Sequence, residues 1–201
     1  MTNEPQVSNL RTNYMIGIPL VMKTFKNGVK LSEQKTDYDS SSATNSLLLP
    51  RYIYSNKGTA DINRTADKKI TFDQYDDKGN VTQYTVESGS PVSIIWGYSQ
   101  TQPIAKIENA SNVQIAAALG VSGINALNES NMAAINALRS NAAFANCMIS
   151  TYTYIPLVGV STITDPKGDA VTYTYDSFGR LEFVKDKNGN LLSENQYNYK
   201  P

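Results

Sequence analysis

The acidic residues of this chain gather in short clusters that could serve acid–base catalysis or bind a metal ion. The clusters are Asp73, Asp76 and Asp77; Asp165 and Asp169; and Asp186 with Asn188 and Asn190. Nothing in their spacing sets two carboxylates on opposite sides of a cleft, as a paired-carboxylate hydrolase requires. Because aspartate side chains also stabilise turns by bonding to nearby backbone, turn formation is the default explanation for these clusters.

The stretch DKNGNLLSE, which begins at Asp186, matches a calcium-binding loop only in part. Such a loop needs oxygen ligands at alternate positions, a glycine at the sixth position and a glutamate near the twelfth. Here Gly189 comes too early, and Glu194 falls at the ninth position. We therefore expect no metal site, and the sequence indicates no cofactor.

Two features of the composition argue against catalysis. The chain has no histidine, which removes the usual general base and the commonest metal ligand. Its one cysteine, Cys147, lies in the apolar stretch FANCMI, where we expect it to pack in the core rather than act as a nucleophile. Lys106 and Glu108 are predicted to share a strand face as a surface ion pair. We expect no catalytic residue and no enzymatic activity.

Charge and hydropathy exclude two further classes of partner. The 18 basic and 18 acidic residues cancel, so no basic face is expected for nucleic acid. The longest apolar runs, SLLLP and SIIWGY, are far shorter than the roughly 20 residues of a membrane-spanning helix. The first residues, MTNEPQVSNL, lack the basic and apolar regions of a signal peptide. We expect no membrane span and no signal peptide in this chain.

Seven aromatic residues could form a platform for a sugar or a protein. They are Tyr84, Trp96, Tyr98, Tyr152, Tyr154, Tyr173 and Tyr175. Tyrosine and tryptophan supply large, rigid contact areas, but in a repetitive sheet they also pair across strands and hold the register. Rings interleaved between strands would indicate a structural role, and a line of exposed rings would indicate binding.

The elements that carry these residues follow a repeat. The repeat occurs in two copies with identical spacing. The first copy contains Tyr75, Asp76, Gly79 and Gly89, and the second contains Tyr175, Asp176, Gly179 and Gly189. Glycine lies four residues after the tyrosine, and a second glycine follows ten residues later. Each copy predicts strand, turn, strand, turn and strand, with glycine in the left-handed position of the turn. Asn27-Gly28 predicts a further hairpin near the start of the chain.

Residues 111–146 break this pattern, because they are rich in Ala, Leu, Asn and Met. Ser111 and Gln114 form a capping-box pair that opens a short helix, which Gly120 can terminate. A second helix is predicted from apolar residues spaced by three and four, namely Met132, Ile135, Leu138, Ala142 and Ala145. The sequence thus predicts four regions: an N-terminal hairpin and partial repeat with polar loops (1–64), hairpins (65–110), a helical insertion (111–146) and C-terminal hairpins (147–201).

With these motifs in place, the chain resembles RHS/YD-repeat proteins. The family pattern is Tyr-Asp, two residues, Gly, a polar residue and then an apolar strand. YDSFGRLEFVKDKNGN and YDDKGNVTQY match it, and KNGVKLSEQKTDYD is a partial unit. IIWGYSQTQPIAKIENA and STYTYIPLVGVSTITDPKGDAVTYTYDSFGRL are similar to segments of large RHS-like surface proteins of Bacteroidetes, in their C-terminal part. The resemblance implies a sheet wound from hairpins, which in better-known members closes into a shell around a toxic cargo. No segment here corresponds to the self-cleaving aspartyl site of some members.

We therefore expect a mainly β fold, in which stacked antiparallel hairpins form one continuous twisted sheet with the helical insertion packed on it. The expected function is a non-enzymatic structural module of a large secreted or cell-surface RHS/YD-repeat protein, as part of a toxin-encapsulating shell. The alternative is a carbohydrate- or protein-binding adhesion module that uses exposed aromatics. The expected partners are the rest of a longer chain or neighbouring repeats, or a protein or glycan.

Overall fold

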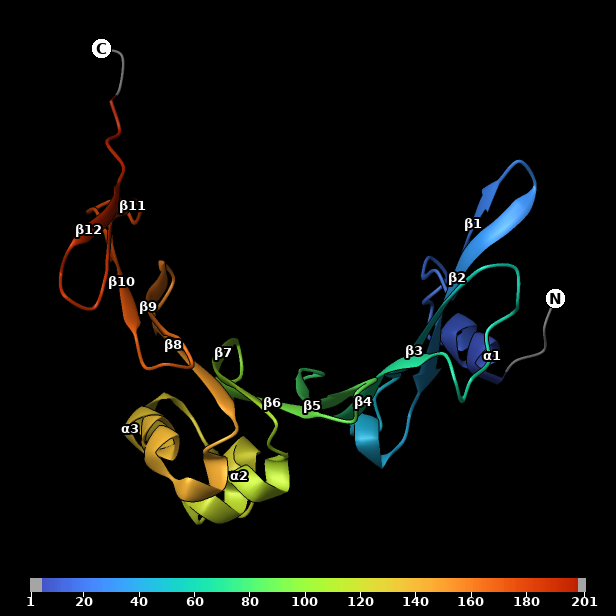
Figure 1. Ribbon diagram of the computed structural model, residues 1–201, viewed down its shortest axis with the longest axis horizontal. Coiled ribbons are helices and arrows are strands. Elements are labelled where there is room, and N and C mark those ends of the chain that lie inside the picture. The colour runs from blue at the N-terminus through green and yellow to red at the C-terminus, as the bar shows by residue number, and fades with distance from the viewer. Residues whose placement is uncertain (1–4, 199–201) are drawn as a thin grey trace. The chain divides into compact units, whose positions relative to one another are not determined.

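The computed structural model describes residues 5–198, and within them the chain forms twelve strands and three α-helices (Figure 1). The strands are β1 (Val21–Lys26), β2 (Val29–Asp39), β3 (Leu49–Lys57), β4 (Lys68–Tyr75), β5 (Val81–Val86), β6 (Pro91–Gly97), β7 (Gln102–Glu108), β8 (Met148–Ile155), β9 (Gly159–Thr164), β10 (Ala170–Tyr175), β11 (Leu181–Lys185) and β12 (Leu191–Glu194). Neighbours in the sheet follow sequence order from β1 to β12, and the hairpins are antiparallel. The predicted mainly β architecture with a helical insertion is confirmed.

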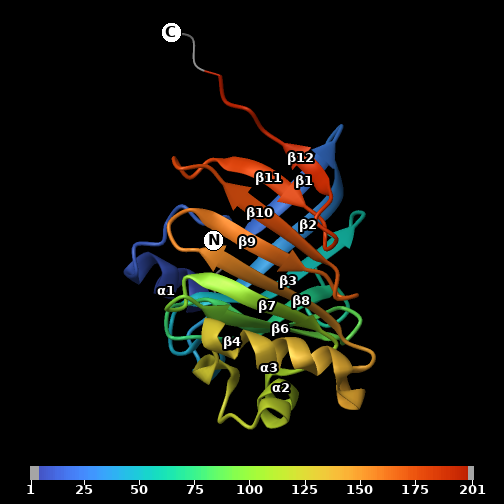
Figure 2. The ribbon, with the colours of Figure 1, turned by 90° about the vertical axis from the view of Figure 1, so that its left-hand side faces the viewer.

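The chain divides into two compact units, the first ending at Val92 and the second starting at Ser93. The first holds α1 (Pro5–Thr12) and the strands from β1 to β5, and β6 begins at its end. The second holds α2 (Asn112–Leu119), α3 (Met132–Ala137) and the strands from β7 onwards (Figure 2). The sequence did not predict α1, which Gln6 ties to β2 by accepting a hydrogen bond from the Tyr38 backbone N–H at 2.8 Å.

The hairpins share a bulge next to the turn. In the β4–β5 hairpin Tyr75 pairs with Val81 and Gln74 with Gln83, so Thr82 is the extra residue. In the β10–β11 hairpin Tyr175 pairs with Leu181 and Thr174 with Phe183, with the same offset. Bulges of this kind bend a strand and increase its twist. The Asn27-Gly28 hairpin between β1 and β2 is confirmed, with both residues at positive φ.

The first helix of the insertion forms as predicted. The Ser111 hydroxyl accepts a hydrogen bond from the Gln114 backbone N–H at 3.4 Å, and the Gln114 side chain accepts one from the Ser111 N–H at 2.8 Å. Gly120 ends α2 in the left-handed conformation, with a φ of 67°. Both ends of this helix are therefore set by local residues.

The second predicted helix is wrong in its length. The α-helix α3 stops at Ala137, and short 3-10 turns at Leu138–Ser140 and Ala142–Phe144 follow it. Asn141 breaks the helix, because its backbone is extended and its side chain accepts a hydrogen bond from the Ala143 N–H at 3.0 Å. Consequently Ala142 and Ala145 are exposed rather than on a buried helix face, and Phe144 takes the core position.

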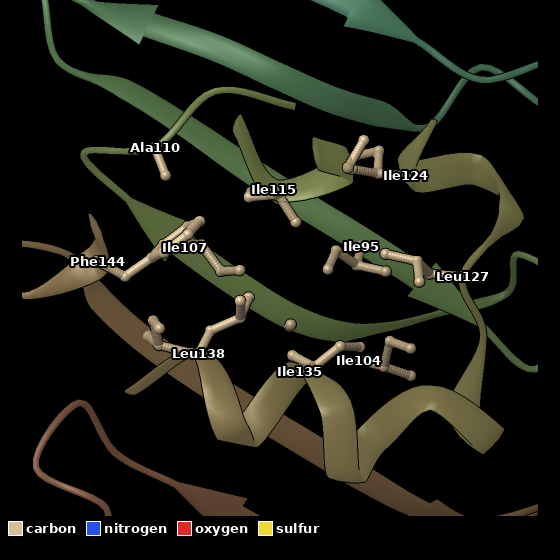
Figure 3. Packing of buried hydrophobic residues seen from close by; sticks show 13 residues of the cluster. Ile95, Ile104, Ile107, Ala110, Ile115, Ile124, Leu127, Ile135, Leu138 and Phe144 are labelled. Carbon is tan, nitrogen blue, oxygen red and sulfur yellow. The ribbon is translucent and has the colours of Figure 1, made fainter. Parts of the chain in front are cut away.

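The main hydrophobic core lies in the second unit, between the helical insertion and strands β6 to β8 (Figure 3). Its members are Ile95, Ile104, Ala105, Ile107, Ala110, Ile115, Ala116, Ile124, Leu127, Ile135, Leu138, Phe144 and Ile149. The predicted burial of Ile135 and Leu138 is confirmed, since their exposed fractions are 0% and 3%. The insertion thus covers one face of the sheet with branched apolar side chains, which stabilises both layers.

The first unit buries fewer apolar side chains and more polar ones. Its buried apolar residues are Leu10, Tyr54, Tyr75 and Val92. Among its buried polar residues is Lys30, whose ammonium lies 2.7 Å from the Glu33 carboxylate and 3.0 Å from that of Asp61. The same ammonium donates to the Ala60 carbonyl oxygen at 2.7 Å. These bonds fasten the loop between β3 and β4 to strand β2.

Candidate functional site: the repeated Tyr-Asp turns

The turn that follows Tyr75 is held by the Asp76 side chain. Its Oδ1 accepts hydrogen bonds from the backbone N–H groups of Lys78 at 2.9 Å and Asn80 at 2.8 Å, and Oδ2 accepts one from Asn80 Nδ2 at 2.8 Å. Gly79 sits at a φ of 83°, a region that favours glycine. The carboxylate is 1% exposed and bonds within its own turn, so the local backbone already accounts for its presence.

Three turns of the second unit repeat this arrangement. The Oδ1 atom of Asp176 accepts from the backbone N–H groups two and four residues later, at 2.9 and 3.0 Å. Asp165 does the same at 2.9 and 2.8 Å, and Asp186 at 2.8 Å in both cases. Each turn has glycine at positive φ in its fourth position, namely Gly168, Gly179 and Gly189. The sequence motif therefore repeats together with its pattern of hydrogen bonds.

The lowered pKa of two of these carboxylates follows from the same contacts. The Arg180 guanidinium donates to Asp176 Oδ2 at 2.7 Å and, with the turn N–H groups, holds the pKa of Asp176 below its usual range. The side-chain amide of Asn190 and the backbone N–H groups of its turn lower the pKa of Asp186. Both side chains are thus stabilised in the ionised form, as acceptors.

The turn at Gly89 keeps the backbone pattern without the carboxylate. The Val86 N–H donates to the Ser90 carbonyl oxygen at 3.3 Å and the Gly89 N–H to that of Val86 at 2.9 Å. The equivalent bonds at the Asp186 turn are 3.0 Å each. Gly89 has a φ of 83° and Gly189 one of 82°. The second glycine of each copy therefore occupies the same turn conformation, with or without an aspartate.

The repeat tyrosines cross to the neighbouring strand. The Tyr75 hydroxyl in β4 donates to the Pro50 carbonyl oxygen in β3 at 2.5 Å, and the Tyr175 hydroxyl in β10 donates to that of Val160 in β9 at 2.8 Å. Two tyrosines outside the predicted motif make the same kind of bond: Tyr154 to Pro103 and Tyr197 to Leu181, both at 3.0 Å. Tyr75, Tyr154 and Tyr175 lie near the ends of their strands and bond to the start of the strand before. Tyr197 follows β12 and bonds to the first residue of β11. Burial raises the pKa of Tyr75 and of Tyr154, so both stay protonated donors.

Two of the other acids in the clusters bond to side chains of neighbouring strands or turns. Asp73, in β4, accepts a hydrogen bond from the Thr85 hydroxyl of β5 at 2.6 Å. Asp169 pairs with Lys187 at 2.6 Å. Within residues 5–198 there is no group of three or more His, Cys, Asp or Glu side chains that could hold a metal ion.

The structure also bears on the predictions for the Lys106–Glu108 pair and for Cys147. The surface ion pair of Lys106 and Glu108 is confirmed at 2.7 Å. Cys147 is half-buried at the edge of the core rather than within it, and its thiol lies 3.5 Å from the Asn109 carbonyl oxygen. Burial raises the pKa of this thiol, which disfavours the nucleophilic thiolate.

The seven candidate aromatics are all half-buried. Tyr98 and Tyr154 stack edge to face with ring centroids 5.4 Å apart, and Tyr84 lies 6.5 Å from Phe72 on the paired strand. Tyr175 covers Gly159 on the adjacent strand. These rings are interleaved between strands, which is the arrangement that indicates a structural role.

Comparison with known proteins agrees with the repeat geometry. The family model described as RHS Repeat matches residues 159–191, which span β9 to the first residue of β12 and contain the second predicted copy. The chain contains an RHS repeat. Within this RHS repeat lie Tyr175, Asp176, Gly179 and Gly189, together with the Val160 carbonyl that Tyr175 contacts.

Solved structures similar to this chain are much larger. It is similar to the crystal structure of TcdB2-TccC3-Cdc42, with a TM-score of 0.45 and 13% identity over 92% of this chain and 10% of that chain. It is also similar to TcdB2-TccC3 without its hypervariable C-terminal region, with a TM-score of 0.43 and 13% identity over 94% of this chain and 10% of that chain. For the Photorhabdus luminescens Tc holotoxin pore the TM-score is 0.30, with 13% identity over 94% of this chain and 10% of that chain. This chain thus spans about a tenth of each of those chains. No curated protein sequence matches it.

The helices in the part of the chain that the structure describes were compared with the requirements of a membrane span. None of its helices combines the length and the apolar character needed to cross a bilayer.

Proposed function

We propose that this chain is a non-enzymatic structural module, a length of RHS-repeat sheet within a longer protein. The observation that carries the proposal is the recurrence of one self-contained turn. At four turns an aspartate accepts the same pair of backbone N–H bonds. Four tyrosine hydroxyls, three near strand ends and one just after β12, bond to a carbonyl at the start of an earlier strand. The polar groups that might do chemistry therefore satisfy the backbone of the sheet.

The strands at the two ends of the sheet order support continuation of the sheet. All described residues of β1 and of β12 are exposed, although both strands carry apolar side chains. Met22 and Phe25 are exposed in β1, and Leu191 and Leu192 in β12. An exposed strand with apolar side chains is open to pairing with another strand. Neighbouring repeats of the same longer chain are the partners we propose for both strands.

Hydrogen exchange tests this role. We expect backbone amides of β1 and β12 to exchange rapidly in the 201-residue chain and to become protected when the natural flanking sequence is present. A chain extended by scrambled flanking sequence of the same length is the matched control. Unchanged exchange in the naturally extended protein would contradict the proposal.

A position outside the producing cell, within a shell that encloses a toxic cargo, belongs to the same proposal. It is supported by the RHS repeat at residues 159–191, since the resemblance to RHS proteins implies such a shell. Digestion of intact cells with an added protease tests the location. Loss of the protein from intact cells supports an external position, and full protection until lysis contradicts it.

The absence of catalysis is also proposed and can be measured directly. We expect hydrolysis of nitrophenyl esters and glycosides in the presence of this chain to stay at the rate of buffer alone. Turnover that disappears when Asp73, Asp76, Asp165 or Asp176 is changed to Asn would overturn the non-enzymatic assignment.

A further inference from the structure

Backbone strain gathers at one place in the second unit. Tyr98, Ser99 and Gln100 are three consecutive non-glycine residues in the left-handed region, with φ of 51°, 58° and 64°. Leu157, in the loop between β8 and β9, also has a φ of 64°. L-residues rarely adopt this conformation, and it persists where surrounding contacts impose it, often at functional sites.

A contact from the helical insertion holds the strained turn in place. The Glu129 carboxylate accepts a hydrogen bond from the Tyr98 backbone N–H at 2.6 Å, and this bond lowers the pKa of Glu129. Gly97, just before the turn, has no room for a side chain, because a Cβ there would lie 2.7 Å from Ile104 Cγ2 and 2.9 Å from Glu129 Oε2. The turn is therefore fixed by the fold.

This turn and the β8–β9 loop enclose a pocket of about 530 Å³. Its walls are Tyr98, Thr101, Gln102, Tyr154 and residues 155–160, and none of these side chains carries a charge. The tyrosine hydroxyls are already engaged: that of Tyr98 accepts from the Tyr154 N–H at 2.9 Å, and that of Tyr154 donates to the Pro103 carbonyl at 3.0 Å. The pocket thus offers mainly aromatic and aliphatic surface.

Exposed apolar side chains continue the pocket onto the surface. Ile155, Leu157 and Val158 are all exposed, Leu157 completely. Val158 also adjoins the next turn, since a Cβ on Gly179 would lie 3.7 Å from its Cγ1, and that turn exposes Phe178. Exposed apolar residues beside a concave site are typical of protein–protein contacts.

We propose that this pocket binds an uncharged apolar side chain presented by a polypeptide partner, with Leu157 and its neighbours as the contacting rim. A charged anchor is disfavoured because no wall residue could pair with it. A sugar is disfavoured because its hydroxyl groups would meet tyrosine hydroxyls that already bond to the backbone. This binding role goes beyond the structural role proposed above, which stands whether or not the pocket binds.

The probe is a set of blocked amino acids observed by NMR on the ¹⁵N-labelled 201-residue chain. We expect N-acetyl-leucinamide and N-acetyl-phenylalaninamide to shift the amide resonances of residues 98–102 and 155–160, with affinities in the millimolar range. N-acetyl-lysinamide, N-acetyl-glutamic acid amide and maltose are expected to leave them in place. Shifts caused by maltose alone, or equal shifts by all the amides, would overturn the proposal, as would no shift with either apolar amide.

Two matched variants separate binding from folding. Leu157→Asn removes the apolar rim while keeping a residue that tolerates positive φ, so the fold should be retained. We expect it to weaken binding of the apolar amides about threefold to tenfold. Val113→Asn removes another exposed apolar side chain, from α2 and outside the pocket, and should leave binding unchanged. Equal binding by wild type and Leu157→Asn, with the fold of both verified by NMR, would contradict the assignment.

Discussion

Gly159 and Tyr175 are in steric contact across the paired strands β9 and β10. A Cβ at Gly159 would lie 2.5 Å from the Tyr175 hydroxyl oxygen and 3.0 Å from Cζ of the ring. The Tyr175 ring therefore lies over a position that glycine alone leaves open. From there its hydroxyl reaches the carbonyl oxygen of Val160, the next residue along β9.

Gly159→Ala should displace this ring and destabilise the chain by about 1–3 kcal/mol, because the added methyl group overpacks the contact. Urea unfolding measures the loss. In a Tyr175→Phe background the same substitution should cost less, since the nearest atom, the hydroxyl oxygen, is gone. Strictly additive effects of the two substitutions would contradict the steric contact.

The glycines of the Tyr-Asp turns should resist β-branched replacement. Gly79 and Gly179 have φ of 83° and 74°, so Gly→Val at either should cost about 1–3 kcal/mol. Gly→Asn at the same positions is the matched control and should cost less, because asparagine tolerates the left-handed region. Chemical denaturation that shows no loss for both valine variants would remove the strain argument.

Local signals in the sequence were sufficient to predict the Asn27-Gly28 hairpin, the hairpins of the two repeat copies and the first helix of the insertion, α2. Asn27-Gly28 predicts its turn because both residues accept positive φ, and Ser111 with Gln114 predicts the start of α2 because the two side chains cap each other. The end of α3 was missed, since Asn141 competes for the backbone in a way that apolar spacing does not reveal.

Contacts between residues far apart in sequence could not be predicted. Tyr75 bonds to Pro50 across 25 residues, and Tyr154 to Pro103 across 51, because loops and the helical insertion separate the paired strands. Tyr98 meets Glu129 only after the insertion has folded back over the sheet. The sequence thus contained the turn chemistry of the repeat, whereas the carbonyl partners of its tyrosines depend on which strands become neighbours.

Leu138→Ala tests how far the insertion stabilises the second unit. Leu138 is 3% exposed and packs in the core with Ile135 and Phe144, so truncation should cost about 2–5 kcal/mol. Val113→Ala, at an exposed position of α2, should change the free energy of unfolding by less than about 0.5 kcal/mol. Similar, small losses for both variants would show that the insertion adds little stability.

Acid should weaken the Asp176 turn in a defined pH window. The pKa of Asp176 is lowered in the folded chain, chiefly by its bonds to Arg180, so folding favours the ionised form. Its contribution to stability is present above the ordinary aspartate pKa of about 3.9. It is lost as the pH falls below that value and through the lower pKa of the folded state.

The Asp176 carboxyl carbon can be titrated by NMR in the wild-type chain and in Arg180→Gln. We expect the midpoint in the wild type to lie below the ordinary aspartate value and to rise in the variant, because the guanidinium that donates to Oδ2 at 2.7 Å is removed. The midpoint should not reach that of an unfolded peptide, since the Phe178 and Arg180 positions still supply backbone N–H donors to Oδ1. Identical midpoints in the two proteins would show that the backbone of the turn, rather than the arginine, sets the charge state of the repeat aspartate.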